Sequence, residues 1–315
     1  MMLKKLLPRT IAIHLGLIRE TAHCVHNLKY DMRAQYLTDK AINCTKRGVS
    51  DEDYGNELIV SLTTYGKRLY SVHLAIESIM QGSVLPNRII LWLGYELQDT
   101  PLPAVLRNQM KRGLEIKFCK DVRSYTKLYP ALCNYPDADV ITIDDDIIYN
   151  YDLVEALVEA HRAYGDCIVA RRIHKVVMGD DGKPVAYNNW KWTGGDWTPS
   201  LLNFLTGVGG VYYPAGSLDK EVLREEVFTD ICKYADDVWF YAMAVKKGTK
   251  VMRVRAVSTT GEDYLLNESV QDMGLCKTNV DNGLNDRQIA AVFARYNINE
   301  ILVKESGRLC GANKG

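Results

Sequence analysis

The chain has 315 residues, of which 47% are hydrophobic and 25% are charged, and its 39 basic residues balance its 39 acidic ones. This composition is typical of a globular protein and excludes disordered, collagen-like and coiled-coil chains. A net charge of zero argues against a generally basic nucleic-acid-binding protein, so we expect no nucleic-acid partner. The eight cysteines include no Cys-x-x-Cys pair, which favours free thiols in a reducing cytoplasm over a zinc ribbon.

The first 50 residues are basic: they hold nine Lys or Arg against three Asp or Glu, so they carry +6 and the remainder carries −6. Apolar residues between Leu3 and Ile18 recur at helical spacing, which predicts a helical extension. With the acidic stretch 50–56 as a linker, this extension is expected to cover 1–56 and the main domain 57–315. We predict neither a signal peptide nor a membrane span. The extension is interpreted either as a solvated helix or as a helix that docks on an anionic membrane surface, which would place the protein in the cytoplasm at the inner face of the membrane.

From residue 58 onward, apolar strands alternate with helices. The pattern predicts strands at 58–64, 88–93, 114–119, 139–143 and 167–170, with helices at 69–80, 102–112, 126–134 and 152–164 between them. Apolar strands in this alternation indicate an α/β fold with a mostly parallel sheet covered on both faces. The second half is less regular, with a Trp- and Gly-rich loop at 187–197, a glycine-rich strand or turn at 206–214, helices at 217–226, 236–247 and 286–295, and a strand at 250–255.

Three consecutive carboxylates, Asp144, Asp145 and Asp146, follow the predicted strand 139–143. Ligand sites in parallel α/β sheets lie at the carboxyl ends of strands. Adjacent carboxylates repel one another, and a Mg²⁺ or Mn²⁺ ion relieves that repulsion. Alternate residues of an extended segment point the same way, so Asp144 and Asp146 are predicted to act together on the metal. The structural alternative is a solvated acidic turn that caps the next helix.

A second acidic pair, Asp236 and Asp237, begins the predicted helix 236–247. Carboxylates at this position stabilise a helix amino terminus through its dipole. A carboxylate at a helix start can equally serve as a general base. The sequence alone leaves both interpretations open.

Five blocks of sequence, in order, carry a resemblance to a known family. SLTTYGKR, CKDVRSYTKLYPAL, ITIDDDIIY, FLTGVGGVYYP and ADDVWFYAMAVKKG resemble segments of bacterial family 2-type glycosyltransferases with a GT-A fold, of the capsule and lipopolysaccharide biosynthesis kind, over residues 57–300. The resemblance implies a Rossmann-like GT-A domain with a nucleotide-binding half (57–150) and an acceptor half (151–315). It also implies a hexosyltransferase-like enzyme that moves a sugar, with inversion, from a nucleoside diphosphate to a hydroxyl of a glycan or lipid-linked acceptor. The expected donor is a UDP-sugar and the expected metal is Mn²⁺ or Mg²⁺.

The resemblance also implies roles for individual residues. It gives Asp237, or less directly Asp236, the role of catalytic base, and Asp146 with Asp144 the role of metal ligands. The nucleotide donor would be held by Thr63, Tyr65, Arg68, Asp121, Lys127, Asp144 and Asp145. The acceptor would meet Gly209 and Gly210 of the glycine-rich turn, which also includes Gly207, together with Trp190, Trp192, Trp197 and His174.

The chain departs from the family pattern because it has no histidine after His174 to complete a metal site. The metal would then depend on Asp146, phosphate and water, or on a late residue such as Asp272. Two alternative functions are a nucleotidyltransferase that makes nucleotide sugars and a non-catalytic carbohydrate-binding protein. The first should have a basic glycine-rich loop after the first strand, which TTYGKR matches poorly. The second would explain the Trp loop but not the acidic triplet.

Overall fold

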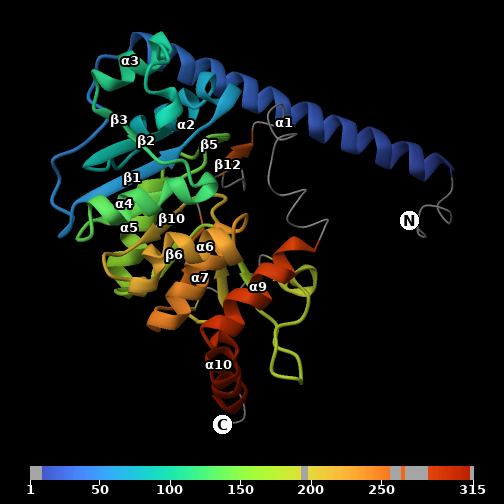
Figure 1. The fold of residues 1–315 in the computed structure, drawn as a ribbon. Helices are drawn as coiled ribbons and strands as arrows, with labels where there is room; N and C mark the ends of the chain where they lie inside the picture. The colour runs from blue at the N-terminus through green and yellow to red at the C-terminus, as the bar shows by residue number, and fades with distance from the viewer. Residues whose placement is uncertain (1–8, 193–197, 256–263, 267–282, 313–315) are drawn as a thin grey trace.

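The structure is a computed structural model that describes residues 9–192, 198–255, 264–266 and 283–312 (Figure 1). A seven-stranded sheet lies at its centre. Its strands are β1 (Leu58–Thr63), β2 (Arg88–Gly94), β3 (Leu114–Cys119), β4 (Asp139–Thr142), β6 (Ile168–Ala170), β10 (Val211–Tyr213) and β11 (Val251–Arg253). The strand order is β11-β6-β10-β4-β1-β2-β3. Every neighbouring pair is parallel except those that β10 makes with β4 and β6, so the expected mostly parallel α/β sheet is confirmed.

Helices pack on both faces of the sheet because alternate residues of each strand point to opposite sides. Leu58, Val60 and Leu62 of β1 enter one hydrophobic core, whereas Ile59 enters the other. The first core is closed by α2 (His73–Met80), α3 (Ala104–Met110) and α5 (Leu153–Tyr164). The second is closed by α4 (Tyr129–Asn134), α6 (Glu225–Ile231), α7 (Asp236–Lys247), α9 (Leu284–Arg295) and α10 (Ile298–Ala312).

The antiparallel strand β10 brings the glycine-rich turn to the acidic triplet. Val211 at the start of β10 pairs with Thr142 at the end of β4. The residues before Val211 therefore lie beside the residues after Thr142, at the carboxyl edge of the parallel strands. Gly209 and Gly210 have φ angles of 94° and 101°, a conformation in which a side chain would be strained. Glycine in this turn is thus required by the backbone as well as by any close approach of a ligand.

Two small sheets complete the domain. β5 (Ile147–Tyr149) pairs with β12 (Tyr264–Leu266), and β7 (Ile173–Lys175) lies between β8 (Lys191–Trp192) and β9 (Asn203–Leu205). In the described residues, short 3₁₀ helices join the larger elements: η2 (Gly66–Tyr70), η3 (Tyr95–Leu97), η4 (Arg123–Lys127), η5 (Tyr187–Asn189) and η6 (Lys220–Leu223). The helix expected at 217–226 is in fact η6 followed by α6, and the last predicted helix is followed by α10.

The predicted amino-terminal helix is present as α1 (Arg9–Asn43), and its first half projects away from the body (Figure 1). Its second half is anchored, because Leu37 and Ala41 are fully buried, Leu37 in a cluster with Leu74 of α2. Most of the apolar face expected between Leu3 and Ile18 falls on residues or side chains outside the described part. Of the helices in the described part, none combines the length and the apolar character needed to cross a bilayer.

The segment 44–57, which includes the linker expected at 50–56, packs closely on the body. The Gly48 N–H donates to the Arg112 carbonyl at 2.9 Å, and Val49 is buried. A Cβ at Gly48 would lie 2.4 Å from the Met80 side chain, so this close contact accommodates glycine and no larger residue. The segment therefore fixes the base of α1 on the main domain.

Candidate active site

A cavity of about 550 Å³ opens at the carboxyl edge of the parallel strands. It lies where ligand sites of α/β sheets are found. Segments from both halves of the domain line it: the residues after β1, β3 and β4, the β7–β9 region, the turn before β10 and the start of α7. The sequence-predicted residues on its wall are Thr63, Tyr65, Arg68, Asp121, Lys127, Asp144, Asp145, Asp146, His174, Asp236 and Asp237.

The middle carboxylate of the triplet is fixed by two neighbours. Asp145 accepts hydrogen bonds from the Thr64 hydroxyl at 2.5 Å and from Arg68 Nη1 at 2.8 Å. Arg68 Nη2 also lies 3.1 Å from Asp146 Oδ2. Burial raises the pKa of Asp145, while Arg68 and Thr64 act to lower it. Asp145, which is predicted to bind the nucleotide, lines the cavity and holds Arg68 in place on the loop after β1.

The side chain of Asp146 is partly buried and lines the cavity. Burial, and then the charge of Asp144, raise the pKa of Asp146 to about 6, while Arg68 opposes the shift. Burial is the larger cause of this shift, and repulsion from the neighbouring carboxylates adds to it. A further positive charge at Asp144 and Asp146 would relieve that repulsion.

Lys127 is the cation at the centre of the cavity. Its Nζ lies 3.1 Å from Asp144 Oδ1 and 3.2 Å from Asp236 Oδ2, so it joins the triplet to the start of α7. Burial acts to lower the pKa of Lys127, but Asp144, Asp236 and Asp237 outweigh it and raise the pKa well above its ordinary value. Lys127 is therefore charged at neutral pH.

The acidic pair differs in environment. Asp236 is buried, whereas Asp237 is half-buried and accepts a hydrogen bond from the Gly207 N–H at 3.0 Å. Burial, and then the charge of Asp236, raise the pKa of Asp237 to about 7, against the effect of Lys127. A carboxylate with a pKa close to the working pH is suited to accept a proton. The structure thus brings together the triplet, Lys127 and the acidic pair, which are separated by about 90 residues of chain.

The remaining donor-side residues line the outer part of the cavity. Tyr65 is exposed, and the Arg68 guanidinium lies 5.5 Å from its ring centroid. The Thr63 hydroxyl donates to the Trp92 carbonyl at 3.0 Å. Asp121 accepts from the Arg123 N–H at 2.7 Å, which orders the loop after β3.

The acceptor-side predictions are met unevenly. His174 lines the cavity but is buried, and burial together with Arg172 lowers its pKa to about 3, so it is neutral. Trp190 is in the core, where its indole N–H donates to the Val185 carbonyl at 2.8 Å and its ring packs on Phe204. The structure does not bring Trp190 to the cavity. Of the turn residues, Gly207 approaches the site, since a Cβ there would lie 2.5 Å from Lys127 Nζ. Gly209 lies against Arg171 and against Tyr264, which lines the cavity, whereas Gly210 faces Leu153. Trp197 and Asp272 lie outside the described residues, and so does the side chain of Trp192.

Several lining residues were not predicted from the sequence. Thr64 is next to the predicted residues Thr63 and Tyr65. Glu96 follows the carboxyl end of β2, and the rule that ligand sites lie at the carboxyl ends of parallel strands could have predicted it. Tyr187, Tyr234 and Tyr264 also line the cavity. No sequence signal marks them, because the small sheets and loops that carry them have no periodic pattern.

The residues present are compatible with a divalent cation. Within the described residues there is no group of three or more His, Cys, Asp or Glu side chains arranged to hold a metal. Asp144 and Asp146 nevertheless offer two carboxylates of the hard-oxygen kind. Mg²⁺ is commonly held by one or two carboxylates, with the remaining ligands from substrate phosphates and water. These two side chains fit such a site only with a phosphate-bearing ligand.

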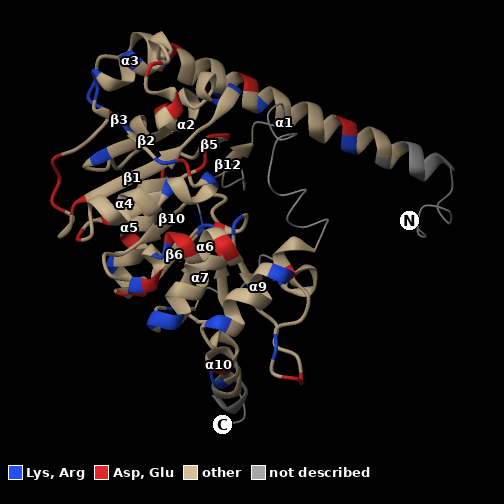
Figure 2. Cartoon of the chain, viewed as in Figure 1, with Lys and Arg blue, Asp and Glu red and all other residues tan. Residues whose placement is uncertain are grey.

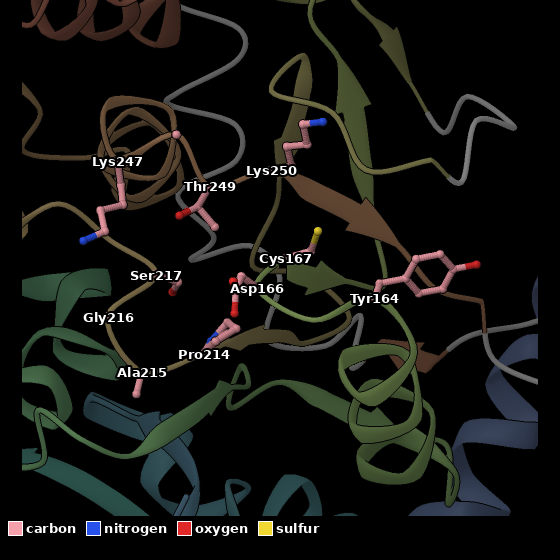
Figure 3. Close-up of a pocket in the computed structure, with 11 residues that line it drawn as sticks. Tyr164, Asp166, Cys167, Pro214, Ala215, Gly216, Ser217, Lys247, Thr249 and Lys250 are labelled. Carbon is pink, nitrogen blue, oxygen red and sulfur yellow. The ribbon is translucent and has the colours of Figure 1, made fainter. Parts of the chain in front are cut away.

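A second cavity, of about 500 Å³, lies at the opposite edge of the sheet (Figure 3). It is formed where β6 and β11 begin and where β10 ends. Its two lysines, Lys247 and Lys250, point in different directions instead of converging (Figure 3). We therefore place the active site in the first cavity.

Comparison with known proteins gives only distant similarities. No protein-family model and no curated protein matches the chain. Among solved structures, the chain is similar to the mannosyltransferase PcManGT of Pyrobaculum calidifontis in complex with GDP-Man and Mn²⁺, at 16% identity over 93% of this chain and 79% of that one, with a TM-score of 0.47. It is also similar to S. aureus TarS in complex with UDP (12% identity, 66% of this chain and 59% of that one, TM-score 0.41) and to CMP:2-keto-3-deoxy-manno-octonic acid synthetase with CTP (11%, 66% and 93%, 0.40). These similarities are too distant to assign a function, which depends on the site itself.

Proposed function

We propose that the protein is a GT-A-type glycosyltransferase that moves a sugar from a nucleoside-diphosphate sugar to a hydroxyl group. The observation that carries this proposal is the meeting of two acidic groups in one cavity. Asp144 and Asp146 lie at the strand end, Asp236 and Asp237 begin α7, and Lys127 lies between them. The carboxylates at the strand end suit a diphosphate with its cation, and the acidic pair at the start of α7 suits proton transfer from the acceptor.

The donor half would bind the nucleotide at the ends of β1 and β3. Thr63, Tyr65 and Asp121 follow β1 and β3 and line the cavity, and they are proposed to meet the base and ribose. Arg68 and Lys127 supply positive charge beside the triplet, where the diphosphate would lie. Charged groups fixed before the reaction stabilise the charge that develops on a leaving group. A divalent cation held by Asp144 and Asp146 would add a Lewis acid to that stabilisation.

Asp237 is proposed as the general base. Its Oδ1 is fixed by the Gly207 N–H, which leaves the rest of the carboxylate to accept the acceptor's proton as the hydroxyl oxygen attacks the anomeric carbon. The attack comes from the face opposite the leaving diphosphate, so one displacement inverts the anomeric centre. The expected donor is a UDP-sugar, and the expected acceptor is a glycan or lipid-linked glycan of surface polysaccharide synthesis.

The exposed face of α1 is proposed to hold the enzyme at the cytoplasmic face of a membrane. An exposed apolar stripe runs along it beside Lys29 and Arg33, and charges of both signs occur along the helix (Figure 2). A helix with an apolar face and basic neighbours can lie in the interface of an anionic bilayer. A lipid-linked acceptor would be reached from there.

The proposal is tested by substituting the metal-side carboxylate. Asp146→Asn should abolish sugar transfer with the fold intact, and excess chelator should abolish transfer by the wild-type protein. Asp137→Asn, an identical change at an exposed position outside the cavity, should leave transfer unchanged. Full transfer by Asp146→Asn, or by the wild-type protein in chelator, would contradict metal-dependent transfer. Formation of a nucleotide sugar from a nucleoside triphosphate and a sugar phosphate would instead assign the nucleotidyltransferase function.

A further inference from the structure

Lys127 lies where it can control access to the acidic triplet. Its side chain is buried, and its Nζ is within 3.2 Å of carboxylates from two separate elements, Asp144 after β4 and Asp236 at the start of α7. The backbone of Lys127 is fixed as well, because its carbonyl accepts a hydrogen bond from the Ser61 hydroxyl of β1 at 2.6 Å. The side chain is therefore the movable part of a residue whose main chain is anchored on the central strand.

The path of that side chain depends on a glycine. A Cβ at Gly207 would lie 2.5 Å from Lys127 Nζ, well inside van der Waals contact. The φ angle of Gly207 is not in the left-handed region, so the backbone alone does not require glycine here. The space that Gly207 leaves empty is the space that the ammonium group occupies.

The ammonium group lies against Asp144 Oδ1, one of the two oxygens through which Asp144 could hold a cation. Nζ is 3.1 Å from Asp144 Oδ1, and a divalent ion on the same oxygen would be a few ångströms from a positive charge. At such a distance inside a protein, like charges repel strongly. A metal can therefore bind Asp144 well only after Lys127 has moved away.

Arg68 differs from Lys127 in this respect. It is held by a pair of contacts, to Asp145 and to Asp146, and Asp145 is held in turn by Thr64. A planar guanidinium in such a fork is geometrically fixed, whereas lysine is a point charge on a flexible four-carbon stem. Of these two cations beside the triplet, Lys127 is the one that can exchange partners.

We propose that Lys127 is an internal counter-ion that blocks the metal position of Asp144 until a diphosphate arrives and takes the ammonium group from it. This inference depends on the proposed function, because the diphosphate of the donor is the anion that would accept Lys127. Metal and nucleotide would then bind cooperatively, each raising the affinity for the other by the same factor. An empty enzyme would hold metal weakly and an enzyme with its donor would hold it firmly, so the cation would be recruited together with the donor.

The test measures Mn²⁺ binding to the full-length protein in the absence of nucleotide, by calorimetry or by the electron paramagnetic resonance of free Mn²⁺. Lys127→Gln should bind Mn²⁺ at least ~10-fold more tightly than the wild type, a difference of about 1.4 kcal/mol. Lys120→Gln removes the same charge from an exposed lysine that pairs with Glu225, and it should bind Mn²⁺ as the wild type does. Lys127→Arg keeps the positive charge, and its binding of Mn²⁺ should stay as weak as that of the wild type.

Two further measurements keep the test valid if the substitution lowers stability. Loss of Lys127 leaves buried carboxylates unpaired, so Lys127→Gln is expected to unfold at a lower temperature, and Mn²⁺ should raise that temperature more in Lys127→Gln than in the wild type. Gly207→Ala forces the ammonium group aside without removing it, and it should also tighten Mn²⁺ binding in the absence of nucleotide.

The second part of the test adds UDP, GDP or CDP. In the wild type, the nucleotide that binds should tighten Mn²⁺ binding by a larger factor than it does in Lys127→Gln, because in the variant no ammonium group has to be displaced. If a nucleoside diphosphate binds with Mn²⁺ but Lys127→Gln and the wild type bind Mn²⁺ alone equally well, this inference is overturned and the proposed function stands. If none of the nucleotides binds the wild type with Mn²⁺, the proposed function fails and this inference fails with it.

Discussion

The five central aspartates show how position alone separates the roles of identical side chains. Asp145 is used internally to hold Arg68, Asp144 and Asp236 share Lys127, and Asp146 and Asp237 have raised pKa values. The position of the triplet at a strand end predicted a ligand site there, and the resemblance to GT-A glycosyltransferases implied that the acidic pair belongs to the same site. The sequence could not predict which carboxylate of the triplet is already paired, since Arg68 and Thr64 reach Asp145 only through the turn of η2.

The first prediction at the residue scale concerns the two acids at the start of α7. Adjacent helical residues diverge by about 100°, so Asp236 and Asp237 cannot share one role. Asp237→Asn should bind nucleotide and metal normally and lose about 10²–10⁴-fold in turnover, the usual loss on removing a general base. Calorimetry and steady-state kinetics on Asp237→Asn and Asp236→Asn, side by side, measure this. If Asp236→Asn loses turnover and Asp237→Asn remains active, the assignment is reversed.

The second prediction is the direction of the pH dependence. Burial and Asp236 raise the pKa of Asp237 to about 7, so the carboxyl gains a proton as the pH falls through that value. A base must be ionised, and kcat should therefore rise with pH through about 7 and then level off. Asp236→Asn removes the neighbouring charge and should shift this rise to lower pH in whatever activity remains. A kcat that is constant or falls over the same range would rule out Asp237 as the titrating base.

At the scale of elements, the regularly spaced helices and the strands of the parallel sheet were predicted well, whereas the strands of the two small sheets were not. The predicted helix 236–247 and strand 114–119 have the bounds of α7 and β3, because their apolar spacing is regular over several residues. The strands β5, β7, β8, β9 and β12 have three residues or fewer, too few for a periodic signal. The reversed direction of β10 was also missed, since Val211–Tyr213 is equally apolar in either orientation and only its partners determine the direction.

A buried ion pair is expected to hold α2, α3 and the base of α1 together. Arg112 Nη1 lies 2.8 Å from Glu77 Oε2, both side chains are almost fully buried, and Arg112 Nε donates to the Lys46 carbonyl. Glu77→Gln should lower the free energy of unfolding by roughly 3–5 kcal/mol, because it leaves a buried guanidinium without its counter-charge. Urea denaturation measures the change, with the exposed Glu57→Gln as a control. A loss below about 1 kcal/mol would show that the pair is not effectively buried in solution.

The exposed face of α1 should bind anionic membranes. Val25, Leu28, Met32 and Tyr36, three or four residues apart, are 44–66% exposed and form one stripe, with Lys29 and Arg33 beside it. Leu28→Gln with Met32→Gln should weaken binding to anionic vesicles, and salt should weaken wild-type binding, since each basic residue near such a surface contributes about 1 kcal/mol. Leu223→Gln, at an exposed apolar position on the body, is the matched control. Vesicle binding that is unchanged by the double substitution, or insensitive to salt, would contradict this role.

At the scale of the whole molecule, the fold brings two halves of the chain to one cavity. Residues after β1, β3 and β4 form the side proposed for the donor, and the start of α7 with the turn before β10 forms the side proposed for the acceptor. The resemblance to glycosyltransferases was based on the same segments, in the same order along the chain. The identity of the sugar and acceptor depends on loops such as 187–197, whose aromatic residues are partly core and partly outside the described residues.

The central claim is that this cavity transfers sugar from a nucleoside diphosphate. It is tested most directly by following nucleotide release from a panel of UDP-, GDP- and dTDP-sugars with Mn²⁺, in the wild type and in Asp146→Asn. We expect the wild type to release nucleoside diphosphate from at least one donor, and this release to disappear in chelator and in Asp146→Asn. If the wild type releases no nucleoside diphosphate and binds none of the donors, or if it instead releases pyrophosphate from nucleoside triphosphates, the account is wrong.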